Sequence, residues 1–115
     1  MSAYPSAAYK VLTSPQMASL LVDAVFAGAP IDLADGFIHL STADQLGETV
    51  SKHFAGQSGL HIAAVDLAKL GDTVRWEPSR GGQMFPHIYA PLPLSAVIAH
   101  GPLTCADGGA INLPG

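Results

Sequence analysis

The stretch "DGFIHLSTADQ", residues 35–45, decides the fold because it leads from an apolar strand directly into the start of a helix. Its first half predicts a buried strand over residues 36–40, which His39 interrupts. Its second half contains T-x-x-Q at 42–45, the pattern of a capping box, and so predicts a helix over about residues 43–54. An imidazole inside an apolar strand, next to a helix start, needs an explanation beyond packing.

The segment before this stretch predicts a strand and a first helix. "AYKVLT", residues 8–13, is typical of a short strand. Ser14 as N-cap and Pro15 at the first helical position predict a helix start, and Gly28 and Pro30 predict its end. Apolar residues at helical spacing predict the buried face of this helix: Met17, Leu20, Leu21, Ala24 and Val25.

The segment after it predicts strands without intervening helices. These strands are expected over residues 60–66, 72–76, 84–90 and 94–100, with an exposed loop over 77–83. Pro86 predicts that its strand avoids a central ladder position or bends there. Two early helices followed by several strands indicate an α+β fold, with the two N-terminal helices packed on a mainly antiparallel sheet.

Length and composition predict one globular domain over residues 1–115, with an ordered core of about 8–100 and a Gly/Pro-rich C-terminal tail. The chain is 49% hydrophobic and only 12% charged, which excludes an intrinsically disordered protein. The most apolar window, residues 17–31, is too short to span a bilayer, and no signal peptide is expected. The single cysteine, Cys105, indicates a cytoplasmic protein and is interpreted as a buried or incidental thiol.

The net charge of −4 and the total of five Lys and Arg residues argue against a nucleic-acid partner, because duplex binding needs several cations on one face. A small anionic ligand needs only one or two cations and a few backbone N–H groups, so it stays open. A membrane partner is not expected, and the oligomeric state cannot be read from the sequence.

A first group of polar residues surrounds the 35–45 stretch. Strand alternation places His39 on the same face as Phe37 and Ser41. The following helix carries a polar stripe beside an apolar one, which fits either a cleft wall or an ordinary amphipathic boundary. The polar stripe consists of Gln45, Thr49 and His53, and the apolar stripe of Leu46, Val50 and Phe54.

A second group lies in "RWEPSRGGQMFPHIY", residues 75–89. There His87 and Tyr89 share one strand face, and Arg75 and Glu77 share another, with Trp76 pointing the opposite way. Gly81 and Gly82 allow either a tight turn or a close approach of the backbone to a ligand. Each histidine also has a purely structural interpretation, which we keep for His61 and His100.

Several kinds of site find no support in the motifs. Neither H-x-x-x-H nor C-x-x-C occurs, so no metal site is predicted, and His39, His53 and His87 would converge only through the fold. The nucleophile elbow G-x-S-x-G is absent, as are the Rossmann and P-loop glycine motifs.

The sequence motifs that contain these two polar groups resemble those of a known family of small bacterial proteins, the domain-of-unknown-function family 952. The resemblance rests on "GFIHLSTADQ" at 36–45, "HF" at 53–54 and "VRWEPSRGGQMFPHIYAPL" at 74–92, and it extends over about residues 8–98. It implies a minimal ADP-ribosyltransferase-like fold that binds NAD in a cleft between two small sheets. NAD would then be a substrate, and no cofactor would be required.

Carried over by position, the resemblance implies nine cleft residues. They are His39, Ser41, Thr42, Gln45, Trp76, Glu77, Phe85, His87 and Tyr89. This chain departs from the pattern at Tyr9-Lys10, where family members often have Tyr-His, and it lacks a glutamate near the last strands. The wider fold uses such a glutamate in catalysis, so the fold can be inherited without the chemistry.

Three functions follow as alternatives. In the first, the protein transfers or hydrolyses an ADP-ribosyl group, with Glu77 as the catalytic group and His39 and His87 as positioning residues. In the second, it binds a nucleotide-like small molecule without turnover, with an anionic group held by His39 and the N–H groups around Thr42. In the third, the motifs serve only the fold of a structural or interaction domain.

Overall fold

The computed structural model describes residues 4–105 and 110–114. Over these residues the chain is an α+β fold whose paired strands are all antiparallel. The strands are β1 (Ala7–Leu12), β2 (Val25–Phe26), β3 (Ile38–His39), β4 (His61–Asp66), β5 (Val74–Pro78), β6 (Met84–Ile88), β7 (Leu92–Pro93) and β8 (Val97–Pro102). The helices are α1 (Ser14–Asp23), α2 (Pro30–Asp35) and α3 (Leu46–His53), with 3-10 turns at Ala43–Gln45, Leu67–Thr73, Arg80–Gly82 and Leu94–Ala96.

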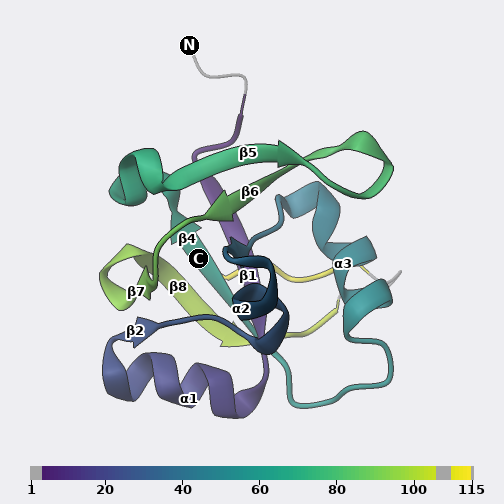
Figure 1. Cartoon of the computed structure of the whole chain (residues 1–115). Helices are drawn as coiled ribbons and strands as arrows, with labels where there is room; N and C mark the ends of the chain where they lie inside the picture. Colours follow the sequence, from purple (N-terminus) through teal and green to yellow (C-terminus); the bar gives the residue numbers. More distant parts are fainter. Residues whose placement is uncertain (1–3, 106–109, 115) are drawn as a thin grey trace.

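The strands form three small sheets, with the orders β1-β4-β8, β3-β6-β5 and β2-β7. Figure 1 shows α1 at one end of the molecule and the β5–β6 hairpin at the other. The first two sheets meet where β1 runs beside the end of β3. There the backbone of Tyr9 exchanges hydrogen bonds of 2.8 and 2.9 Å with that of Ser41. This junction brings the two polar groups of the sequence within reach of β1.

The helix α1 starts one residue earlier than the sequence analysis predicted. Its N-cap is Thr13, whose hydroxyl accepts from the Gln16 N–H, while the Gln16 side chain accepts from the Thr13 N–H at 2.9 Å. Ser14 instead donates to the carbonyl of Gly59 at 2.6 Å. Thr13 is the N-cap because these reciprocal hydrogen bonds satisfy two backbone N–H groups, those of Thr13 and Gln16.

The end of α1 and the chain that follows it differ from the prediction. The helix stops at Asp23, well before Gly28, because Ala24 takes a left-handed conformation with φ of 61°. The predicted apolar face is therefore wrong at its C-terminal end, where Leu21 and Val25 are exposed. Pro30 begins α2, a helix of six residues that the sequence analysis missed, so the expected two helices are three α-helices in the described chain.

The strand β6 is the central strand of its sheet, so the first of the two alternatives for Pro86, a strand that avoids a central ladder position, is wrong. The Pro86 carbonyl accepts from the N–H of Leu40 at 3.1 Å, so the missing N–H of Pro86 also faces the β3 side. Because β3 ends at His39, the absent hydrogen bond falls where this ladder stops. On the other side, β5 pairs with all of β6, from Val74↔Ile88 to Pro78↔Met84.

The core confirms the predicted apolar stripe of the third helix. Leu46 is buried, and Val50 and Phe54 pack against it. In the main core cluster, Trp76 packs from β5 and stacks on Tyr4, with ring centroids 4.2 Å apart. Cys105 is exposed, which leaves the incidental thiol of the two interpretations given for it. Among the described residues, no helix has both the length and the apolar character needed to cross a membrane.

Candidate functional site

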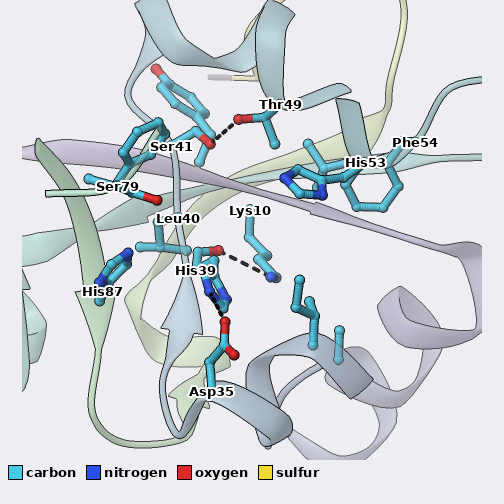
Figure 2. Close-up of a pocket in the computed structure, with 15 residues that line it drawn as sticks. Lys10, Asp35, His39, Leu40, Ser41, Thr49, His53, Phe54, Ser79 and His87 are labelled. Carbon is cyan, nitrogen blue, oxygen red and sulfur yellow. Dashed lines mark hydrogen bonds and ion pairs between the residues drawn. The ribbon is translucent and has the colours of Figure 1, made fainter. Parts of the chain in front are cut away.

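A pocket of about 260 Å³ lies where β1, α2, β3, α3 and β6 come together. Lys10 reaches it from β1, His39 from β3 and His87 from β6. Its wall also contains the side chains of Ser41 and Thr49, whose hydroxyl oxygens are 2.8 Å apart (Figure 2). The two polar sequence groups, which are far apart in the sequence, therefore contribute to a single concave site.

Lys10 is buried in this wall and fully engaged by neighbouring acceptors. Its ammonium nitrogen lies 3.0 and 3.2 Å from the two carboxylate oxygens of Asp32, and 3.1 Å from the carbonyl oxygen of His39. Burial lowers the pKa of Lys10, while the charge and hydrogen bond of Asp32 act in the opposite direction. An ammonium group has three N–H donors, and three acceptor atoms surround this one.

Asp32 is the buried anion that connects these groups. It accepts from Lys10, from the backbone N–H of Ala29 at 2.8 Å, and from both the backbone N–H and the ring of His39. Burial alone would raise the pKa of this carboxyl group. The hydrogen bond from His39, the charge of Lys10 and the N–H of Ala29 outweigh burial and lower the pKa to about 2.

His39 lies between two carboxylates. Its Nδ1 is 2.7 Å from an Asp32 oxygen, and its Nε2 is 2.9 Å from an oxygen of Asp35 at the end of α2. Because carboxylates only accept hydrogen bonds, both contacts are hydrogen bonds when both ring nitrogens carry protons. Figure 2 shows the bond to Asp35 at the pocket wall. The neighbouring Phe37 packs its ring on His39 and on His87, with centroids 4.7 and 4.1 Å apart.

His87 is held differently, since only one of its ring nitrogens has a protein partner. Its Nδ1 lies 2.8 Å from a Glu77 oxygen, which also accepts from the Tyr89 hydroxyl at 2.6 Å. An ionised Glu77 accepts only, so Nδ1 donates in this contact, and in the neutral tautomer of the ring Nε2 keeps a lone pair. Nε2 points away from Glu77 and has no partner among the described residues, although the His87 side chain is only 5% exposed.

The hydrogen bonds around Glu77 also shift the pKa values of Glu77 and Tyr89. The bond from Tyr89, then that from His87, lowers the pKa of the Glu77 carboxyl group. The hydrogen bond between Tyr89 and Glu77 also raises the pKa of the Tyr89 hydroxyl. If Tyr89 lost its proton, its negative charge would lie beside that of Glu77. The Arg75 guanidinium lies 5.0 Å above the Tyr89 ring and completes the exposed side of this group.

The structure places four of the nine predicted cleft residues in the pocket wall. These are His39, Ser41, Phe85 and His87. Five others lie outside the wall: Thr42, Gln45, Trp76, Glu77 and Tyr89. From the predicted polar stripe of α3, Thr49 and His53 line the pocket, whereas Gln45 does not.

The residues outside the wall have structural contacts instead. Gln45 is buried and joins the helix start to β6, since its amide donates to the Met84 carbonyl at 2.9 Å. The side-chain oxygen of Gln45 accepts a hydrogen bond from the backbone N–H of Thr42 at 3.0 Å, as the predicted capping box requires. This N–H is therefore not available to bind an anion. Glu77 reaches the pocket only through His87.

The sequence analysis missed Asp32 and Asp35, the two carboxylates that hold His39. A helix of six residues has too few turns to show a hydrophobic period, so α2 and its acidic residues gave no pattern. One local signal existed, because Pro30 at the helix start, Asp32 in its first turn and Gly36 after its end fit a short capped helix.

No group of three or more His, Cys, Asp or Glu side chains within the described parts of the chain is arranged to hold a metal ion. The histidines that the sequence left open as a metal set, His39, His53 and His87, all line the pocket. His39 has both ring nitrogens in contact with carboxylate oxygens, so neither nitrogen is open toward a metal ion in this arrangement.

Comparison with known proteins gives a family and a set of solved structures. A family described as "Protein of unknown function (DUF952)" matches residues 11–100. The crystal structure of protein CC0527 from Caulobacter crescentus is 41% identical, with a TM-score of 0.83, over 93% of this chain and 94% of that chain. The solution NMR structure of the same protein gives 40% identity and a TM-score of 0.78, over 93% and 91% of the two chains. No curated protein matches.

Proposed function

Because the chain belongs to the family described as protein of unknown function DUF952, whose description names no activity, we propose its function from the pocket. We propose that the pocket binds a small nucleotide-like ligand, with an ADP-ribosyl compound such as NAD or ADP-ribose as the leading candidate. The observation that carries the proposal is the Nε2 of the buried His87, which has no partner among the described residues and lies at the wall of a pocket that His39 also lines.

The polar groups of the pocket suit such a ligand. A buried ring nitrogen without a partner loses a hydrogen bond, unless a ligand or water supplies it. The Ser41 and Thr49 hydroxyls can donate or accept, and they face the same space as Nε2. Apolar side chains such as Phe54 and Phe85 supply the surface against which a base or sugar ring packs.

The same proposal includes an ADP-ribosyltransferase-like fold. Its support is the arrangement of two small antiparallel sheets, β1-β4-β8 and β3-β6-β5, that meet at Tyr9 and Ser41 beside the pocket. The family resemblance implies a ligand between two such sheets. Lys10, where family members often carry histidine, is tied to Asp32 and so does not take over the ligand contact that such a histidine would make.

The test is thermal unfolding with millimolar NAD, ADP-ribose and AMP, for the wild type and for His39→Ala and His87→Ala. A ligand at about a hundred times its dissociation constant adds roughly 2.7 kcal/mol of stability, a shift of several degrees at this size. We expect a shift with NAD or ADP-ribose that both variants lose and that His100→Ala, an exposed control on β8, keeps. No shift with any of the three compounds would leave a structural or interaction domain as the surviving interpretation.

One observation favours a second candidate function, the hydrolysis or transfer of the bound group. The Glu77–His87 pair resembles the carboxylate–imidazole arrangement in which the carboxylate fixes the ring and the far nitrogen accepts a proton. His87 is then the group that touches the substrate, and Glu77 positions it. Release of nicotinamide from NAD, followed by chromatography over hours, tests this function. Turnover that His87→Gln abolishes and Glu77→Gln lowers, with binding retained, supports it, whereas undiminished activity in Glu77→Gln contradicts the role of Glu77.

A further inference from the structure

We infer that the pocket receives an uncharged, hydroxyl-bearing part of its ligand, a nucleoside or its ribose ring, and that any phosphate group stays outside. This inference rests on the proposed function, because it specifies which part of a nucleotide-like ligand enters the site. Three observations carry it: the pairing of charges in the wall, the acceptor nitrogen of His87, and the size of the pocket.

The described charges of the wall are already paired with one another. Lys10 has acceptors for all three N–H groups in Asp32 and the His39 carbonyl. His39 has a carboxylate at each ring nitrogen, and Asp35 is itself one of these partners. A phosphate in the pocket would therefore lie near the Asp35 carboxylate without a described lysine free to neutralise it. The negative charges of the phosphate and of Asp35 would repel each other, so the binding of an anion in the pocket is disfavoured.

The cations outside the wall that the structure describes are also engaged. Lys52 is paired with Glu48 at 3.2 Å, Lys69 donates to the Ser95 carbonyl, and Arg75 lies over Tyr89. None of these three residues lines the pocket.

The unpaired polar atom of the wall calls for a donor on the ligand. When the ring is neutral and Nδ1 donates to Glu77, His87 Nε2 bears a lone pair, which accepts from a ligand hydroxyl or amino group, whereas a phosphate oxygen has no proton to donate to it. The hydroxyls of Ser41 and Thr49 can satisfy further ligand hydroxyls. A ribose ring offers neighbouring hydroxyls that match this acceptor and these hydroxyls without adding charge.

Pocket size gives an independent limit. Pockets for drug-sized ligands measure about 300–1,000 Å³, and this one measures about 260 Å³. A whole dinucleotide exceeds it, so only part of an ADP-ribosyl compound can enter. The paired charges indicate that this part is uncharged.

The experiment is isothermal titration of the full chain with two pairs of compounds, adenosine with AMP and inosine with its 5′-monophosphate, alongside NAD and ADP-ribose. We expect at least one nucleoside to bind as tightly as, or more tightly than, its monophosphate, with an affinity that does not change with salt. A monophosphate that binds tenfold more tightly than its nucleoside, or NAD binding without any nucleoside binding, overturns this inference and leaves the proposed function intact. Nucleoside binding without NAD or ADP-ribose binding supports the inference and removes the ADP-ribosyl ligand. Binding by none of the six compounds removes both.

Two variants sharpen the result. Asp35→Asn removes the negative charge beside the pocket, so we expect the affinity for the monophosphate to rise several-fold relative to the affinity for its nucleoside. Asp44→Asn, an exposed acidic residue that does not line the pocket, is the matched control and should change neither. If Asp35→Asn leaves the monophosphate unchanged, the repulsion argument is wrong.

His87→Leu removes the acceptor and should weaken nucleoside binding by about tenfold. The 2′- and 3′-deoxynucleosides identify the donor, because one of them should bind the wild type as weakly as the intact nucleoside binds His87→Leu. That same deoxynucleoside should lose nothing further in the variant. Additive losses for both deoxynucleosides would mean that His87 contacts no ribose hydroxyl. Cooperative melting of His87→Leu without ligand checks that the variant is folded.

Discussion

Asp32 is the residue through which Lys10, Ala29 and His39 are held together, and it is 2% exposed. Asp32→Asn should lower the free energy of unfolding at neutral pH by about 3–5 kcal/mol, because it leaves the Lys10 charge buried without its partner. Urea unfolding measures this loss. Asp44→Asn, at an exposed position, should stay within about 0.5 kcal/mol of the wild type.

The same residue sets part of the acid sensitivity. The pKa of Asp32 is about 2 in the folded protein, against an ordinary value near 3.9. A lowered carboxyl pKa stabilises the fold above the unfolded-state value, and this stabilisation is lost as the pH falls from about 5 to about 2. We expect the wild type to lose about 2 kcal/mol from this group over that range. An equal acid slope in Asp32→Asn would contradict this assignment.

Tyr89 gives a second prediction at the residue scale. Its hydroxyl donates to Glu77, which raises the Tyr89 pKa. Glu77→Gln removes the negative charge, so the Tyr89 pKa should fall back toward its ordinary value. The carbon chemical shift of the Tyr89 ring, followed by NMR from neutral to alkaline pH, reports this change directly. Tyr9 is the internal control, and a Tyr89 titration that Glu77→Gln leaves unmoved would show that the carboxylate does not set its acidity.

At this scale the sequence predicted the two histidines and missed what holds one of them. Strand alternation gave the strand faces of His39 and His87, the family resemblance implied that both lie in one cleft, and both line the pocket. The partners of His39 could not be predicted, because Asp32 and Asp35 reach it only after α2 folds back beside β3. Glu77 and His87 are diagonal neighbours in the β5–β6 hairpin, where Glu77 lies opposite Phe85 and His87 opposite Arg75, so their contact depends on a register that the sequence did not predict.

At the scale of elements, Ala24 is the position where the local sequence disagrees with the backbone it adopts. It ends α1 in a left-handed conformation with φ of 61°, where glycine is the usual residue. Ala24→Gly should raise the free energy of unfolding by about 0.5–1 kcal/mol, because it removes this strain. Ala18→Gly, the same change at an exposed position inside α1, should lower it by about 1 kcal/mol. Two losses of equal size would mean that Ala24 carries no strain in solution.

Most elements were predicted where periodicity or a cap marked them, as for the strands β1 and β4 and the capping box at Thr42. The end of α1 was wrong because a left-handed alanine breaks the helix before the expected glycine. Of the two alternatives for Pro86, the strand outside a central ladder position was wrong, because the rule concerns the missing N–H, and that N–H faces the end of β3. The pairing of β2 with β7 joins two-residue strands, which are too short to leave a pattern.

At the scale of the whole molecule, one apolar cluster connects α1, the three sheets and Trp76. Leu20→Ala in α1 should lower the free energy of unfolding by about 2–5 kcal/mol, because Leu20 is fully buried. The transition should shift equally in far-ultraviolet circular dichroism and in Trp76 fluorescence, although Figure 1 shows α1 and β5 at opposite ends. A shift in circular dichroism alone would show that the two ends unfold separately.

The fold class followed from the order of helices and strands, and the division into three sheets did not. Order along the chain predicts antiparallel pairing, but β4 joins β1 and β8 while β6 joins β3 and β5. Which strand becomes central depends on how the whole apolar surface is covered, and no single segment encodes that.

The ion pair between Lys10 and Asp32 also has an evolutionary consequence. A neutral side chain at position 10 would leave Asp32 as a buried negative charge with fewer hydrogen-bond donors. A neutral side chain at position 32 would leave the Lys10 ammonium group buried without an anionic partner. Each single exchange crosses a less stable intermediate, so the two positions are expected to change together or in quick succession as the lineage diverges. Relatives that carry a neutral residue at position 10 should therefore differ at position 32 as well. The two positions of this part of the pocket wall are then inherited together.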